Sequence, residues 1–92
     1  MNTQREVIWL EDESEFSRII YEDHEDFTEI QQIKGYFDSE KGYVEMTLIV
    51  QRNEDGKFFK LNYRKWGAGR REIDKLCLTQ VFEKEKTVKY YE

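Results

Sequence analysis

The sequence predicts an α+β fold, an antiparallel meander sheet of about four to five strands with one short helix packed on one face. Apolar and polar residues alternate in two stretches, 43–52 and 57–66, which is the pattern of half-buried strands. A turn sequence, NEDG at 53–56, separates them, and apolar residues at helical spacing occur near the N-terminus. The 92 residues are enough for one hydrophobic core and too few for two, so we expect a single domain over 1–92.

The N-terminal part of the chain predicts one strand and one helix. Residues 6–10 (EVIWL) form a short apolar run that ends at an acidic stretch, which indicates a first strand. The next segment has apolar residues at positions i, i+3 and i+4, namely Phe16, Ile19 and Ile20. This spacing is typical of an amphipathic helix, which we expect over about 13–24 with Ser14 as its N-cap.

The remaining segments outside the central hairpin predict further strands. Residues 29–37 fit a strand with Gly35 as a bulge or kink, although the apolar residues of 27–37 also fit helical spacing. A last strand or strand pair is expected in 76–82 and 87–91. The expected order is therefore β-α-β-β-β-β, with the strands following one another across the sheet.

Charge is divided unevenly along the chain. Residues 11–29 contain nine acidic residues and a single base, Arg18, which gives a net charge of −8. Residues 57–75 contain seven basic residues against Glu72 and Asp74, which gives +5. One interpretation is that the two segments pack against each other and partly cancel, or that both are solvated faces. Two functional interpretations compete with it.

The first functional interpretation uses the acidic segment as a protein-binding surface. Carboxylates along a helix and its flanks can occupy a basic groove on another protein, imitate the phosphates of nucleic acid and steer association. Neighbouring aromatic residues, Trp9, Phe16, Tyr21 and Phe27, are candidate apolar anchors. The residues expected to contact the partner are Glu11, Asp12, Glu13, Glu15, Glu22, Asp23, Glu25 and Asp26.

The second functional interpretation uses the basic strand at 57–66. Bases and aromatic residues share one face of this strand, while Phe59, Leu61 and Tyr63 share the other and are expected in the core. Bases interleaved with aromatics on an open sheet can pair with phosphates and stack nucleobases. The alternative function is therefore a single-stranded nucleic-acid-binding accessory protein, with contacts from Phe58, Lys60, Arg64, Trp66, Arg70 and Arg71.

No motif points to catalysis, a metal site or a cofactor, so we expect no enzyme and no bound cofactor. His24 is the only histidine and lies among acidic residues, and we expect it at the surface. Cys77 lies in an apolar run and is expected to be a small core residue. A lone cysteine forms no intrachain disulfide, and no apolar run has signal-peptide or membrane-span length, which predicts a cytoplasmic protein with no membrane partner.

A short, charged, proline-free chain with the pieces DGKFFKLNYRKW and EKEKTVKYYE resembles the small accessory proteins of bacteriophages and mobile elements of Gram-positive bacteria. The resemblance extends over residues 43–92 and contains no motif that assigns a site residue. It implies inhibition by occupancy, in which the protein binds and blocks a host enzyme or defence complex, as anti-CRISPR proteins do. The expected function is therefore a non-enzymatic interaction module, whose partner is a host or defence-system protein with a basic groove.

Overall fold

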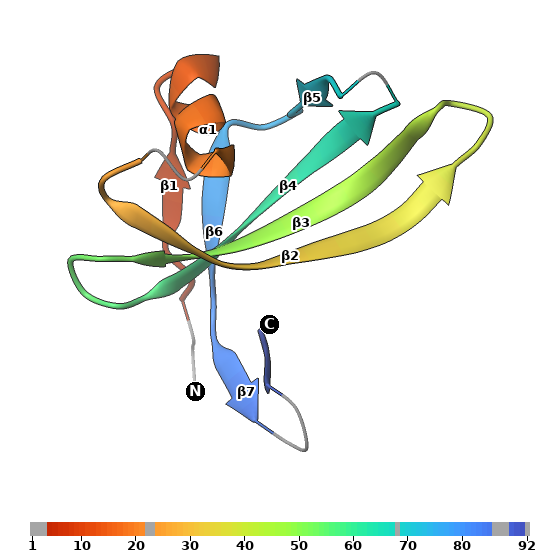
Figure 1. Cartoon of the computed structure of the whole chain (residues 1–92). Helices are drawn as coiled ribbons and strands as arrows, with labels where there is room; N and C mark the ends of the chain where they lie inside the picture. Colours follow the sequence, from red (N-terminus) through yellow and green to blue (C-terminus); the bar gives the residue numbers. More distant parts are fainter. Residues whose placement is uncertain (1–3, 22–23, 68, 86–88, 92) are drawn as a thin grey trace.

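Figure 1 shows the computed structural model of the chain, which describes residues 4–21, 24–67, 69–85 and 89–91. For the last two strands it describes the backbone alone. The elements in chain order are β1 (Val7–Trp9), α1 (Glu13–Ile20), β2 (Phe27–Asp38), β3 (Tyr43–Arg52), β4 (Phe58–Trp66), β5 (Arg71–Glu72), β6 (Cys77–Val81), β7 (Glu83–Glu85) and β8 (Lys89–Tyr91).

The main sheet has six strands, more than the sequence predicts, and the described strand pairs are antiparallel. Its order is β1-β6-β4-β3-β2, with β5 paired to the end of β4. β2, β3, β4 and β6 follow the predicted meander. A meander in chain order would put β1 beside β2, but β1 pairs with β6 at the opposite edge. The chain reaches β2 from β1 by way of α1, which crosses one face of the sheet (Figure 1).

The central hairpin matches its prediction closely and supplies most of the core. β3 covers 43–52 as expected, β4 begins at Phe58, and the register runs from Tyr43 opposite Trp66 to Gln51 opposite Phe58. Gly56 in the turn has a φ of 76°, which suits glycine. The core gathers on the face that α1 covers, and its hairpin members are Val44, Met46, Leu48, Val50, Phe59, Leu61 and Tyr63.

The helix is shorter than predicted and starts on a different cap. α1 ends at Ile20, where the predicted apolar stripe ends, and Phe16, Ile19 and Ile20 are buried. Phe16 packs edge-to-face on Tyr63, with ring centroids 5.9 Å apart. The N-cap is Asp12 and not Ser14, because the Asp12 carboxylate accepts the Glu15 N–H at 3.0 Å. Because Asp12 caps the helix and α1 begins at Glu13, Ser14 is a residue of the first helical turn and not its cap.

β2 is a long strand at the edge of the sheet. It covers 27–38, slightly more than the predicted 29–37, and its register with β3 shifts between Glu29 and Gln31 and again between Lys34 and Phe37. The second shift contains Gly35, as the sequence predicts. A Cβ atom at Gly35 would lie 2.9 Å from the Glu45 carbonyl oxygen, so only glycine lets the two backbones approach this closely.

The C-terminal segment forms one strand of the main sheet and a separate small hairpin. β6 lies within the predicted 76–82, between β1 and β4. The predicted strand at 87–91 corresponds to β8, which pairs with β7. Cys77, at the start of β6, is a free, half-buried cysteine outside the core, so the expectation of a core residue is wrong. The next residue, Leu78, is the one buried in the core, and successive residues of a strand face opposite sides of the sheet.

Candidate functional site

The described acidic residues form two groups, one at the N-terminal end of α1 and one after its C-terminal end. His24, which lies beside the second group in the sequence, contacts Glu15 in the first. Its Nε2 lies 3.0 Å from Oε2 of Glu15 in the first turn of α1, and its Nδ1 accepts the backbone N–H of Asp26 at 3.1 Å. Because Nδ1 is the acceptor in this arrangement, Nε2 carries the proton that is donated to Glu15. The loop after α1 is thereby held against the beginning of α1.

The expectation that His24 lies at the surface is wrong, since the residue is 6% exposed. Its ring packs against Phe27 at 5.2 Å between centroids, and both ring nitrogens have hydrogen-bond partners. A histidine with both nitrogens satisfied can be buried at little cost. The acidic residues next to His24 in the sequence favoured a surface position, and Phe27, three residues later, was the only sequence signal of an apolar contact.

The predicted acidic residues divide into structural and exposed groups. Asp12 caps the helix, and Glu15 accepts hydrogen bonds from His24 and from the Glu11 backbone N–H, which lower the pKa of the Glu15 carboxyl. Glu22 and Asp23 lie outside the described residues. The four remaining members have exposed side chains: Glu11, Glu13, Glu25 and Asp26. Within the described part of the chain, no Lys or Arg forms an ion pair with any acidic residue of 11–29.

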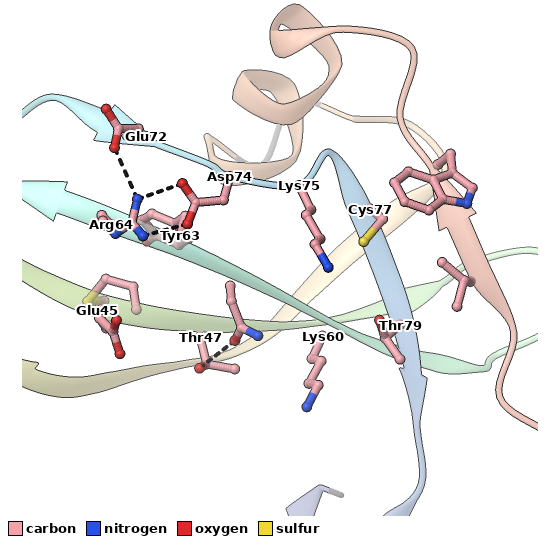
Figure 2. Close-up of a pocket in the computed structure, with 14 residues that line it drawn as sticks. Glu45, Thr47, Lys60, Tyr63, Arg64, Glu72, Asp74, Lys75, Cys77 and Thr79 are labelled. Carbon is pink, nitrogen blue, oxygen red and sulfur yellow. Dashed lines mark hydrogen bonds and ion pairs between the residues drawn. The ribbon is translucent and has the colours of Figure 1, made fainter.

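The basic strand presents a different situation, because Arg64 is held by carboxylates. Its Nη1 lies 3.1 Å from Oε1 of Glu72 and 2.6 Å from Oδ1 of Asp74 (Figure 2). Both contacts raise the pKa of Arg64. Arg70 lies over the Trp66 ring at 4.9 Å and within 3.7 Å of Glu72. The acids that neutralise these bases therefore come from the basic segment itself.

Arg71, Trp66 and Phe58 also have structural contacts. Arg71 donates to the hydroxyl of Tyr21 at 2.7 Å and lies over the Tyr21 ring at 4.9 Å. Trp66 packs on Tyr43 with centroids 5.0 Å apart. Phe58 is half-buried at the other end of β4. The predicted nucleic-acid residues are therefore spread from one end of β4 to the loop beyond its other end. Arg64, Arg70 and Arg71 already make contacts within the protein.

A groove of about 650 Å³ lies on the sheet face opposite α1 (Figure 2). Polar side chains of β3, β4 and β6 form its floor, where Thr47 donates to Asn62 at 3.0 Å, and Trp9 of β1 forms a wall. Lys60 and Lys75 also line it, and neither forms an ion pair among the described residues. These two lysines are the free cations of the groove, and Lys75 was not among the predicted contacts.

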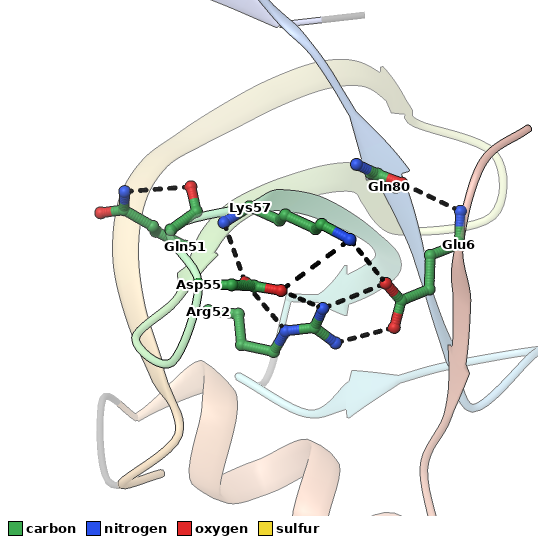
Figure 3. Close-up of polar contacts among 7 residues, drawn as sticks. Glu6, Gln51, Arg52, Asp55, Lys57 and Gln80 are labelled. Atoms are coloured by element: carbon green, nitrogen blue, oxygen red, sulfur yellow. Dashed lines mark hydrogen bonds and ion pairs between the residues drawn. The ribbon is translucent and has the colours of Figure 1, made fainter. Parts of the chain in front are cut away.

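A second charge cluster, which the sequence did not reveal, joins β1 to the hairpin turn (Figure 3). The Arg52 guanidinium bonds to both carboxylate oxygens of Glu6 at 2.8 and 3.0 Å, and to Asp55 at 2.5 and 3.1 Å. It also lies 5.0 Å above the Phe59 ring. Hydrogen bonds from Arg52 lower the pKa of Asp55 to about 2 and lower that of Glu6. The cluster fastens the start of β1 to the end of β3.

Three comparisons with known proteins bear on this chain. No family model, no curated protein and no solved structure matches it. Among the described residues, no helix has the length and apolar character needed to cross a bilayer, and no three His, Cys, Asp or Glu side chains are grouped to hold a metal ion.

Proposed function

We propose that the chain is a non-enzymatic protein-interaction module that binds a basic groove on a partner protein. The binding site is the acidic surface, defined by its exposed members Glu11, Glu13, Glu25 and Asp26. In its sharpest form, the proposal is a phage-type inhibitor that occupies a host enzyme or defence complex, such as an anti-CRISPR. Inhibition in this form needs no reaction, only occupancy of a surface that otherwise receives nucleic acid.

One observation carries the proposal: the described acidic residues of 11–29 form no ion pair with Lys or Arg, whereas Arg52 and Arg64 are paired with other acids. Exposed carboxylates without cations project a negative field over roughly a Debye length, about 8 Å at physiological salt. Such a field accelerates encounter with a basic partner. The interpretation that the two charged segments cancel each other receives no support from the ion pairs.

Tyr21 is the aromatic residue best placed to contribute lasting affinity. Of the four predicted anchors, Phe16 belongs to the core and Trp9 lines the groove on the other face of the sheet. Tyr21 follows α1 directly, is 62% exposed, and is held by Arg71. An aromatic side chain that is already ordered loses little entropy when a partner covers it.

The nucleic-acid alternative has less support because Arg64, Arg70 and Arg71 have internal contacts. What favours it is the pair of free lysines, Lys60 and Lys75, in a groove with an exposed indole, that of Trp9. A single strand bound there would contact the face opposite α1. The two proposals therefore predict binding on opposite sides of the sheet.

The test uses a partner captured from a Gram-positive host lysate and identified by mass spectrometry, followed by binding kinetics with the purified partner. In the variant Glu13→Lys/Glu25→Lys, association should slow and its salt dependence flatten, because the steering charges are reversed. Tyr21→Ala should instead speed dissociation. Excess DNA or RNA should compete with the chain for the partner.

The matched control is Glu40→Lys/Glu45→Lys, which makes the same change in net charge at two exposed positions outside the acidic surface. Glu45 lines the groove on the opposite face of the sheet. Circular dichroism verifies that each variant is folded. The proposal is wrong if the acidic-surface variant binds with unchanged rates, or if the control slows association equally, since net charge alone would then explain the effect. Binding that responds instead to Lys60→Glu would favour the groove.

A further inference from the structure

The long edge strand β2 exposes apolar side chains and, among the described strands, pairs with β3 alone. It is twelve residues long and last in the strand order, at the front of the sheet in Figure 1. Its exposed apolar residues are Ile30, Ile33, Tyr36 and Phe37, and Tyr36 is 81% exposed. The opposite edge, β1, is three residues long. A long apolar edge strand is a template for pairing with another strand.

The register of β2 with β3 determines which face each β2 side chain takes. Gln32 and Lys34 lie opposite buried core residues of β3, so they are on the α1 face, and Ile33 is on the groove face. Because the register shifts after Glu29, this residue shares the α1 face with Gln32. The hydrogen bond from Gln32 Nε2 to Glu29 Oε1, at 2.6 Å, agrees with that placement.

We infer that the occupant of this edge is a second copy of the chain, with the two β2 strands antiparallel and a two-fold axis at Ile33. Ile33 then lies opposite Ile33 of the second copy, and Ile30 lies opposite Tyr36 of the second copy. The register shift after Glu29 also comes opposite the shift before Phe37 of the second copy. Residues that face each other across the dimer therefore point to the same face of the sheet before and after the shifts. Three of the four exposed apolar residues thereby gain apolar partners.

Neighbouring registers fit less well. An axis at Gln31 would place Glu29 opposite Ile33, although these residues are on different faces of the sheet. An axis at Lys34 would create the same conflict between Gln31 and Phe37. An axis at Gln32 keeps the faces but sets Ile33 opposite Gln31 and leaves the exposed isoleucines against polar side chains. The axis at Ile33 is the register that satisfies both the faces and the apolar contacts.

Charge complementarity also favours a second copy over an unrelated extended peptide. Gln32 lies opposite Lys34 of the second copy, and Glu29 is the neighbour of Gln32 on the same face. Glu29 and Lys34 of the second copy are therefore diagonal neighbours, and the two-fold axis repeats this pair. Opposite charges at such positions stabilise a strand pair. An unrelated peptide would match these positions only by chance.

The mass in solution, measured by light scattering over a wide range of protein concentration, tests the dimer. We expect the mass to approach twice 11.3 kDa as concentration rises. Ile33→Lys places two lysines across the axis and should give a monomer that keeps its circular dichroism spectrum, since Ile33 is exposed. Val7→Lys changes an exposed apolar residue of the opposite edge strand and should leave the dimer intact. A monomer at all concentrations overturns the inference, as does a dimer that Ile33→Lys leaves intact.

Charge exchange tests the register independently of apolar contacts. Glu29→Lys and Lys34→Glu, each alone, set like charges beside each other twice and should weaken the dimer on the order of fivefold. The double variant Glu29→Lys/Lys34→Glu restores opposite charges and should recover wild-type dimerisation. Additive weakening in the double variant contradicts the pairing of Glu29 with Lys34.

Cross-linking locates the axis. In a Cys77→Ser background, Ile33→Cys should form a disulfide-linked dimer under oxidation, because opposite residues of paired strands have Cα atoms within disulfide range. Gln32→Cys should cross-link less, and a reversal of this order overturns the proposed axis. None of these substitutions lies in the acidic surface, so failure of the dimer leaves the proposed protein-binding function untouched, and the reverse also holds.

Discussion

The guanidinium group of Arg64 lies between the carboxylates of Glu72 and Asp74, whereas the carboxylates of Glu13 and Glu25 have no Lys or Arg partner among the described residues. Both regions are dense in charge, but among the described residues only the basic region contains bases, Arg64 and Arg70, that pair with acids of the same region. The difference teaches that opposite charges far apart in a sequence need not be each other's partners. In this fold Arg52 and Arg64 are paired with carboxylates and contribute to the structure, whereas the exposed carboxylates of the acidic surface form no ion pair with Lys or Arg among the described residues.

The largest loss of stability is expected on substitution of Arg52, the least exposed of the described ion-paired Lys and Arg residues, with 16% of its side chain exposed. Arg52→Ala removes the hydrogen bonds to Glu6 and Asp55 and the contact with the Phe59 ring. We expect it to lower the free energy of unfolding by about 2 kcal/mol, measured by urea denaturation. Lys65→Ala, at an exposed β4 position, is the control and should change it by less than about 0.5 kcal/mol. Equal effects would remove the distinction between paired and free bases.

Lowering the pH should remove part of the stabilisation that the Arg52 ion pairs contribute. The folded state holds the pKa of Asp55 at about 2, below its ordinary value of 3.8, and also lowers that of Glu6 from 4.5. Because both folded values are depressed, the contribution is complete above about pH 5 and is lost as the pH falls towards 2. The difference in urea midpoint between wild type and Arg52→Ala should therefore shrink over this range. A difference that stays constant with pH would mean that packing of the Arg52 side chain, and not its ion pairs, accounts for the effect.

A smaller effect is expected when Arg64 is released from its acids. Glu72→Gln/Asp74→Asn leaves the Arg64 guanidinium without charged partners beside the groove that holds Lys60 and Lys75. We expect this variant to bind single-stranded DNA more strongly than wild type at low salt, with an affinity that falls steeply as salt rises. Fluorescence anisotropy measures the change. Equal binding by the two proteins would show that pairing of Arg64 does not limit nucleic-acid binding.

The smallest effect on stability is expected in the acidic surface. Glu13→Gln/Glu25→Gln neutralises two exposed carboxylates that have no cationic partner among the described residues. The free energy of unfolding should change by less than about 0.5 kcal/mol, since exposed charges contribute little to stability. Thermal and urea denaturation provide the measurement. A large loss would mean that these acids serve the fold, and the contrast with Arg52 would disappear.

Sequence reasoning recovered the features that depend on neighbouring residues. The alternation over 43–52, the turn at 53–56 and the apolar stripe of α1 are local periodicities, and the structure contains each of them. It failed where a residue contacts residues outside its own helix, strand or turn. The burial of His24 depends on Glu15 and Phe27, and the Arg52 cluster depends on Glu6, 46 residues away.

The sequence by itself determined an α+β chain with a central hairpin and two segments of opposite charge, because periodicity, turn residues and composition are local properties. Only the tertiary structure decided which charges are neutralised, since β5 and the residues after it bring Glu72 and Asp74 to Arg64. The same holds for the edges of the sheet. Pairing of β1 with β6 leaves β2 as the outer strand, and strand order follows from the packing of the whole chain rather than from any one segment.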